Sequence, residues 1–291
     1  MVQYWCINRL DRPNRWKKFS EQIVGKLQLV VHRFPAITGE SVDLSVLSIR
    51  ALRVLETGTR KGHEDLTGRN SIGCYLSHLA LWEKSVEHNE HFFVFEDDSE
   101  PSLTASLDLE KKVSQAILSI EEPFILFFGL HKMSIVQNTS PIIDSTDMKL
   151  HKIDSQRSQL YGTHAYLISP SAARGMIYFS RPIEMQVDSY IVAASRKAGV
   201  QLFLTEPQMF SQSSQFSTDI QIIGLEQTNQ VLFWFNNGKE IEEKTARQLS
   251  TFYLDPIHQE KLGGLLLEKR PDSSYPRICK ELEVGPPTKI G

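Results

Sequence analysis

Hydrophobic residues follow two different spacings along this chain, and the two alternate. Residues 92–95 and 124–128 are unbroken apolar runs, which are typical of strands buried on both faces of a sheet. Residues 13–27 and 71–88 instead repeat apolar positions with helical spacing, as one face of an amphipathic helix requires. The alternation predicts an α/β sandwich with a mostly parallel central sheet flanked by helices.

The other elements follow from the same spacings and from turn residues. Predicted strands cover residues 2–7, 29–34, 92–95, 124–129 and 165–169, and predicted helices cover residues 13–27, 71–88, 103–120, 170–179 and 187–198. Pro13 and Pro170 suit the first turns of their helices. The glycine-rich residues 56–69 are interpreted as a loop, and residues 131–152 as an irregular excursion.

The pattern changes after Gly224, which places a domain boundary near residue 225. Residues 1–225 are interpreted as the catalytic domain and residues 226–291 as a carboxyl-terminal extension. Within the extension, residues 231–235 followed by Asn-Asn-Gly indicate a strand and a turn, residues 242–253 a helix, and residues 258–291 an irregular tail.

The apolar run at 92–95 ends in three consecutive carboxylates, Glu96, Asp97 and Asp98. Ligands gather at the carboxyl ends of parallel strands, and three neighbouring acids raise one another's pKa unless a cation lies among them. A divalent metal ion is the natural partner. Strand alternation would place Glu96 and Asp98 on one face and Asp97 on the other. The alternative is a solvated acidic turn that closes a strand.

The net charge, the cysteines and the lengths of the apolar runs limit which partners and which compartment are expected. The formal net charge of −3 gives no electrostatic case for nucleic acid or an anionic membrane as the main partner. Cys6, Cys74 and Cys279 lie far apart without metal-ligand spacing, which favours a reducing compartment over a disulfide scaffold. The amino terminus has no secretory pattern, and no apolar run is long enough to span a bilayer. We therefore expect a cytoplasmic protein.

Four segments, in order, resemble glycosyltransferase family 25, which contains bacterial lipooligosaccharide galactosyltransferases and collagen galactosyltransferases. They are residues 7–16 (INRLDRPNRW), 71–78 (SIGCYLSH), 95–101 (FEDDSEP) and 161–169 (YGTHAYLIS), the last followed by 187–190 (VDSY). The first segment departs from the family pattern, because its acid, Asp11, is moved by one position. The resemblance covers roughly residues 1–225 and favours the functional interpretation of the acidic strand end.

This resemblance implies a glycosyltransferase-A fold, which is Rossmann-like with a nucleotide-binding first half. It also implies a metal-dependent, inverting transfer of a hexose from a nucleotide-sugar donor to a glycan or lipid-linked saccharide. UDP-galactose is the favoured donor, Mn²⁺ or Mg²⁺ the expected metal, and lipopolysaccharide or polysaccharide biosynthesis the expected process. No nucleic acid or transmembrane segment is expected, while peripheral membrane contact and the oligomeric state stay open.

Several residues of these segments are candidates for holding the donor and the metal. Asp98 is the main candidate for a metal ligand, with Glu96 and Asp97 as further ligands or as contacts to the donor. The other donor-binding candidates are Asn8, Asp11, Arg12, Arg15, Gly73, Ser77 and His78. The arginines suit paired phosphate oxygens, and Gly73 suits a close approach at a helix start. Solvated arginines, a helix cap at Asp11 and a packing histidine at His78 are the alternatives.

An inverting transfer needs a general base opposite the leaving group. Asp188 is the candidate, with a plain helix cap as the alternative, and His164 or Asp219 could take its place. Two other functions stay open. One is a metal-dependent nucleotidyl- or phosphotransferase, for which acids at a strand end would also serve. The other is a catalytically inactive homologue that binds a glycan or a nucleotide.

Overall fold

The computed structural model describes residues 1–57, 62–103, 105, 108–130, 132–134 and 141–213, and the backbone of four short strands further on. The chain divides into two compact units. Residues 1–38, 73–180 and 186–218 form the first unit, and residues 39–72, 181–185 and 219–291 form the second. The candidate site lies wholly within the first unit.

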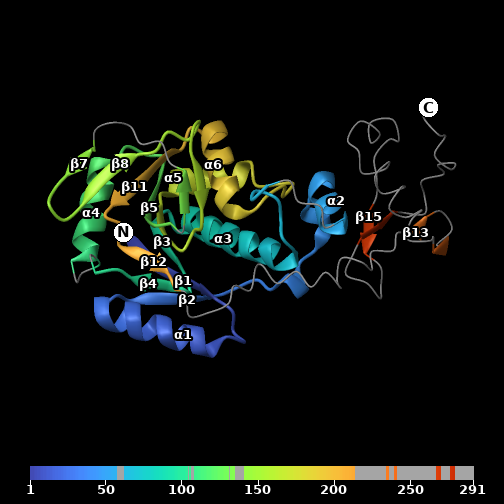
Figure 1. The fold of residues 1–291 in the computed structure, drawn as a ribbon, viewed down its shortest axis with the longest axis horizontal. Helices are drawn as coiled ribbons and strands as arrows, with labels where there is room; N and C mark the ends of the chain where they lie inside the picture. Colours follow the sequence, from blue (N-terminus) through green and yellow to red (C-terminus); the bar gives the residue numbers. More distant parts are fainter. Residues whose placement is uncertain are drawn as a thin grey trace. The chain divides into compact units, whose positions relative to one another are not determined.

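An eight-stranded sheet forms the centre of the first unit (Figure 1). Its strands, in spatial order, are β2 (Val31–Pro35), β1 (Val2–Asn8), β3 (His91–Glu96), β10 (Ala165–Ile168), β5 (Phe124–Gly129), β11 (Gln201–Glu206), β8 (Lys149–Lys152) and β7 (Ile143–Asp144). The pairings of β1 with β2, β1 with β3 and β5 with β11 are parallel, while β10 and β8 run against their neighbours. Six of the eight strands therefore point in the same direction, with only β10 and β8 reversed, so the sheet is mostly parallel in strand direction, as the sequence predicts.

Alternate residues of the strands project to opposite faces of the sheet, and both sets are apolar in its centre. Helices cover both faces and bury these side chains. On one face, Phe93 and Phe95 of β3 pack with apolar residues of α1 (Pro13–Phe19), of the π-helical turn at Ser20–Gly25, and of α4 (Leu109–Ser119). On the other face lies α3 (Arg69–His88), whose Trp82 donates a hydrogen bond to Tyr166 of β10. Successive residues of β3 therefore face different helices.

Local sequence explains where the helices near α3 begin and end. The Ser169 hydroxyl accepts a hydrogen bond from the Ala172 amide and caps α5 (Pro170–Tyr178), which starts with Pro170. The helix α6 (Val187–Ala198) ends at Gly199, whose φ of +67° lies in the left-handed region that favours glycine. Tyr190 of α6 packs edge-on against Tyr75 of α3.

Two smaller strand pairs complete the described part of the first unit. β4 (Ser99–Pro101) pairs antiparallel with β12 (Phe210–Gln212), and β6 (Lys132–Ser134) pairs antiparallel with β9 (Gln159–Tyr161). The β4–β12 pair follows directly after the acidic end of β3. Strand pairing therefore holds the chain before the acidic end, through β3, and after it, through β4.

The second unit contains α2 (Ile49–Thr57) and two 3₁₀ turns at Gly39–Ser41 and Leu44–Val46. Its Arg69 side chain donates hydrogen bonds to the carbonyls of Gly39 and Val42. The strand pairs β13 (Trp234–Phe235) with β14 (Lys239–Glu240), and β15 (Leu267–Lys269) with β16 (Pro276–Ile278), are antiparallel.

The predicted α/β architecture is confirmed, with differences at particular elements. The sequence analysis missed α2 and β11, and also β6, β7 and β8, which lie in the segment 131–152 that was interpreted as irregular. The helix expected over 103–120 begins only at Leu109. The predicted helix over 242–253 lies outside the described residues, and the boundary near 225 stays a prediction. Among the described residues, no helix combines the length and the apolar character needed to cross a membrane.

Candidate active site

The acidic end of β3 splits between the two faces of the sheet. Glu96 is the last residue of β3 and lies on the α3 face, where His78 and Thr163 contact it. Asp97 lies on the α1 face, where Arg15 contacts it. The strand ends there, so Asp98 does not return to the face of Glu96 as simple alternation predicts, and instead lies 3.7 Å from Arg15.

Glu96 is held as a charged carboxylate. Its Oε1 accepts a hydrogen bond of 2.6 Å from the Thr163 hydroxyl and lies 3.5 Å from Nε2 of His78. Burial acts to raise the pKa of Glu96, but hydrogen bonds from His78 and Thr163 and the charge of His78 outweigh it and lower the pKa to about 2. Glu96 is therefore ionised at neutral pH without any bound cation.

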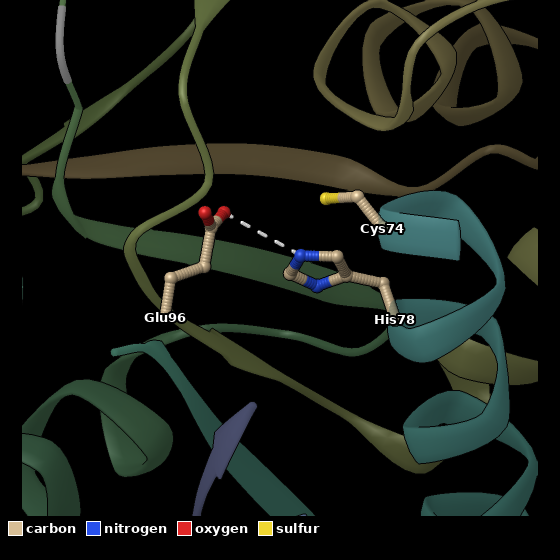
Figure 2. Close-up of side chains that lie close together, drawn as sticks. All are labelled: Cys74, His78 and Glu96. Carbon is tan, nitrogen blue, oxygen red and sulfur yellow. Dashed lines mark ion pairs between the residues drawn. The ribbon is translucent and has the colours of Figure 1, made fainter. Parts of the chain in front are cut away.

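A chain of hydrogen bonds orients His78 toward Glu96. The Trp82 indole donates to the Tyr166 hydroxyl at 2.9 Å, and that hydroxyl lies 2.8 Å from Nδ1 of His78. His78 and Trp82 lie one turn apart on α3, so both reach the same strand, β10. Figure 2 shows the result: the other ring nitrogen of His78 points at the Glu96 carboxylate, and Cys74 projects from α3 beside them.

Cys74 lies one turn before His78 on the same face of α3 and is a free, half-buried thiol. Burial raises the pKa of the Cys74 thiol well above its usual value, and the charges of Glu96, Asp188, Asp98 and Asp97 raise it further. Four acids thus act on one thiol. The candidate acids of β3 and of α6 therefore share one region of negative potential.

Asp97 is neutralised by the protein itself. Its Oδ1 accepts a hydrogen bond of 2.7 Å from Arg15, and its Oδ2 accepts one of 2.6 Å from the Asn8 amide. Asn8 in turn accepts a hydrogen bond of 2.9 Å from Arg33. Arg15 and Asp97 are both buried, so this pair joins the ends of β3 and α1 away from solvent.

Asp98 is the acid without a full set of partners. Its Oδ2 accepts a hydrogen bond of 2.9 Å from Gln212, but its buried Oδ1 has no hydrogen-bond partner among the described residues. Burial, followed by the charge of Glu96, raises the pKa of Asp98 to about 7, against the opposing effects of Gln212 and Arg15. A cation bound at this buried oxygen would stabilise the charged form of Asp98, which burial otherwise disfavours.

The segment from Gly162 to His164 connects the acids of β3 to Asp188. The Gly162 amide donates to Oδ2 of Asp188 at 3.1 Å, the Thr163 hydroxyl donates to Glu96, and the His164 carbonyl accepts from the Glu96 amide at 3.0 Å. Gly162 has a φ of +86°, a conformation that other residues rarely adopt. Asp188 itself lies in the first turn of α6 and is buried.

His164 lies deeper than Asp188. Its ring packs against Gly129, where an added Cβ would come within 2.6 Å of Nε2, and that nitrogen lies 3.4 Å from the Phe210 carbonyl. His164 is 1% exposed. Its ring is therefore enclosed by β5 and β12, while its backbone supports Glu96.

The remaining candidates lie in different surroundings. Asp11 is exposed and forms an ion pair with Arg9 that lowers the pKa of Asp11, while Arg12 precedes the first turn of α1. Because α3 begins at Arg69, Gly73 lies beyond the four free amides of a helix start. The Ser77 hydroxyl donates to the Gly73 carbonyl at 2.7 Å. Asp219 lies outside the described residues.

Three residues that the sequence analysis did not single out contact the acids or their partner His78. Thr163 and Tyr166 lie inside the segment 161–169, so the motif pointed to their strand but not to their roles. Gln212 carried no sequence signal. It reaches Asp98 because β12 pairs with β4.

Comparisons with known proteins place most of the chain in one family. Residues 1–191 match the family model described as glycosyltransferase family 25 (LPS biosynthesis protein). A protein of Drosophila pseudoobscura pseudoobscura named glycosyltransferase 25 family member is 24% identical over 190 residues, covering 64% of this chain and 29% of that protein. One of Aedes aegypti with the same name is 26% identical over 193 residues, covering 64% and 30%. The matched region thus spans less than a third of these relatives.

Among solved structures, UDP-glucose pyrophosphorylase complexed with UDP-glucose aligns with 73% of this chain and 92% of its own, at 12% identity and a TM-score of 0.32. A likeness that weak carries no argument about function. The family match covers most of the chain and includes the acidic end of β3, the start of α6 and the segment between them. This chain belongs to glycosyltransferase family 25.

Proposed function

We propose that this protein is a metal-dependent glycosyltransferase that moves a hexose from a nucleotide sugar to a saccharide acceptor. A UDP-hexose, with UDP-galactose first, is the proposed donor, and a glycan or lipid-linked saccharide is the proposed acceptor. The observation that carries the proposal is Asp98, a buried carboxylate whose Oδ1 lacks a partner among the described residues at the end of a central strand. Family membership supports the reaction class.

The residues present fit a divalent metal ion. Asp98 offers an unpaired oxygen, and Glu96 offers a charged carboxylate on the other side of the strand end. Mn²⁺ and Mg²⁺ prefer oxygen ligands and keep several waters, so one or two carboxylates suffice. When bound, such an ion supplies Lewis-acid stabilisation of the charge on the departing diphosphate. Asp97 takes a positioning role in this proposal, because Arg15 and Asn8 already occupy both of its oxygens.

The chain's own residues perform the other tasks. Arg15 holds Asp97 and lies near Asp98, so it fixes the strand end in the geometry the donor meets. His78 and Thr163 keep Glu96 charged. Asp188 is the proposed general base, which accepts the proton of the acceptor hydroxyl as that oxygen attacks the sugar. The Gly162 amide orients the Asp188 carboxylate for this task.

A donor screen tests the proposed reaction. The protein is incubated with a panel of UDP-sugars, Mn²⁺ or Mg²⁺ and saccharide acceptors, and free UDP and product mass are measured. We expect UDP release with a product heavier by one hexose, and loss of both on chelation. Retained UDP binding without turnover of any donor would favour an inactive homologue, and nucleotide turnover without an acceptor product would favour a nucleotidyl- or phosphotransferase.

Replacement of the proposed base separates chemistry from binding. Asp188→Asn keeps the shape of the side chain but removes the basic carboxylate, so transfer should fall by about 10²–10⁴-fold while donor binding stays within twofold or so. Asp144→Asn, on the exposed end of β7, is the matched control and should leave transfer unchanged. Near-normal transfer by Asp188→Asn would remove Asp188 from this role and direct the same test to His164.

A further inference from the structure

Cys74, His78 and Glu96 form a compact group of three different metal-binding side chains. Their ligand atoms, Sγ of Cys74, Nε2 of His78 and a carboxylate oxygen of Glu96, all lie within 4.8 Å of one another. Figure 2 shows that two of them come from successive turns of α3 and the third faces them from the end of β3. The i and i+4 spacing on a helix places both α3 donors on one face.

These distances are close to those of a tetrahedral site. Zinc bonds of about 2.0–2.3 Å to sulfur, nitrogen and oxygen imply ligand separations of about 3.3–3.8 Å. The observed 3.5 Å between His78 Nε2 and Glu96 Oε1 already lies in that range. The three ligand atoms lie within 4.8 Å of one another, so a movement of the Cys74 side chain of about 1 Å would bring all separations close to that range.

The structure also orients the histidine as metal ligands usually are. Metal-bound histidines commonly engage their second ring nitrogen in a hydrogen bond that fixes the ring. Nδ1 of His78 is 2.8 Å from the Tyr166 hydroxyl, which Trp82 holds in turn, so Nε2 is the nitrogen directed at Cys74 and Glu96. Asp98 takes no part in the contact between His78 and Tyr166.

We propose that Cys74, His78 and Glu96 constitute a Zn²⁺ site centred on α3, which shares only Glu96 with the proposed oxygen-ligand site at Asp98. Thiolate and imidazole ligands favour Zn²⁺ over Mg²⁺ or Mn²⁺, which prefer oxygen. On binding, the Cys74 thiol loses its proton to solvent and coordinates as thiolate. Three protein ligands leave the fourth tetrahedral position for water.

Metal titration of the full chain tests the site without measuring transfer. Metal-free protein is titrated with Zn²⁺ against a chromophoric chelator, and with Co²⁺ to detect the thiolate-to-cobalt charge-transfer absorption. We expect one high-affinity ion per chain and a thiolate band. Cys74→Ala should abolish the band, and both Cys74→Ala and Glu96→Gln should weaken Zn²⁺ binding by more than about tenfold, the least that loss of even a supporting contact costs.

Two control variants make the result specific. Cys6→Ala removes the other described thiol, which is buried in the core, and should keep both the affinity and the band. Asp98→Asn should keep Zn²⁺ binding while losing Mn²⁺ binding, so failure of this proposal is distinguishable from failure of the proposed function. Circular dichroism and melting verify that each variant folds. Absence of Zn²⁺ binding, a missing thiolate band, or unchanged affinity in Cys74→Ala would overturn the proposal.

Discussion

Glu96 and Asp98 lie two residues apart at the end of β3, yet the protein treats their charges in opposite ways. Glu96 receives a hydrogen bond from Thr163 and faces His78, and its pKa falls to about 2. Asp98 receives one hydrogen bond, from Gln212, keeps Oδ1 without a described partner, and its pKa rises to about 7. The neighbouring side chains decide the difference: His78 and Thr163 compensate the charge of Glu96, whereas Asp98 has one hydrogen bond from Gln212 and a more distant Arg15.

The contrast teaches how one acidic strand end can serve two purposes. A carboxylate that is already compensated can position other groups at any pH near neutrality. A carboxylate that is buried and under-compensated is destabilising as an anion and gains most from an incoming cation. Asp97 lies between these cases, since Arg15 supplies its countercharge permanently.

The largest effect should follow from breaking that permanent pair. Arg15→Met removes the countercharge that hydrogen-bonds to the buried Asp97, so the free energy of unfolding should fall by about 3–5 kcal/mol. Urea unfolding measures this loss. Lys17→Met, on the same helix with an exposed partner in Glu21, is the control and should change stability by less than about 0.5 kcal/mol. Equal losses in both variants would mean that the buried pair contributes nothing special.

Removing the under-compensated charge should affect transfer next most strongly. Asp98→Asn keeps a hydrogen-bonding side chain but cannot supply the anionic ligand, so the rate of transfer should fall by about 10²–10³-fold, as for loss of one preorganised electrostatic group. Product formation at saturating donor measures this loss, with Asp144→Asn as an exposed acidic control. Full activity of Asp98→Asn would end the assignment of this residue to the metal.

The raised pKa of Asp98 also predicts a pH effect on stability. Between its usual value of 3.8 and about 7, the folded metal-free protein holds a proton that the unfolded chain has released. The folded state then binds more protons, so this group's contribution to the free energy of unfolding falls as pH rises through that window. The total change is of order 4 kcal/mol, at about 1.4 kcal/mol for each pKa unit between 3.8 and about 7.

This contribution is isolated by comparing the urea unfolding of wild type and Asp98→Asn in the presence of a chelator. The comparison is repeated at several pH values from about 5 to about 8. The variant carries no titrating group at this position, so wild type should lose stability relative to it as pH rises. Parallel pH profiles for the two proteins would contradict the raised pKa. Glu96, whose pKa is about 2, does not titrate in this range.

The smallest effect should come from the compensated side. Thr163→Val removes the hydroxyl that donates to Glu96, at a cost of about 1–2 kcal/mol in the free energy of unfolding. Thr163→Ser keeps the hydroxyl and should stay within about 0.5 kcal/mol of wild type. Thermal and urea unfolding of the two variants would show whether the hydroxyl, or only the volume of the side chain, supports Glu96.

Five of the eight strands of the central sheet and most helices of the first unit could be predicted because their spacing is local. The run ending at Glu96 had to be a buried strand, and the amphipathic stretch containing His78 had to be a helix. The elements that were not predicted have other causes: α2, β6, β7 and β8 are short, and β11 pairs with strands distant in sequence. The antiparallel direction of β10 depends on the path of the whole chain.

The sequence predicted which acidic residues are candidates for the site, but not which side chains surround them. Motif spacing pointed to the three carboxylates and to Asp188, but the placement of Asp98 depends on where β3 stops, which alternation alone does not specify. The partners of Asp98 depend on long-range pairing, since Gln212 arrives through β12. The contact of Arg15 with Asp97 joins residues 82 positions apart, and no local pattern encodes it.

The three residues from Gly162 to His164 carry a mechanical consequence. Two backbone groups and one hydroxyl of this stretch contact Asp188 and Glu96, so the separation of those acids is governed mainly by main-chain geometry. Exchanging exposed side chains on α6 should leave that separation unaltered. Inserting a single residue between Gly162 and His164 should change the separation of the Asp188 and Glu96 carboxylates, whichever residue is inserted.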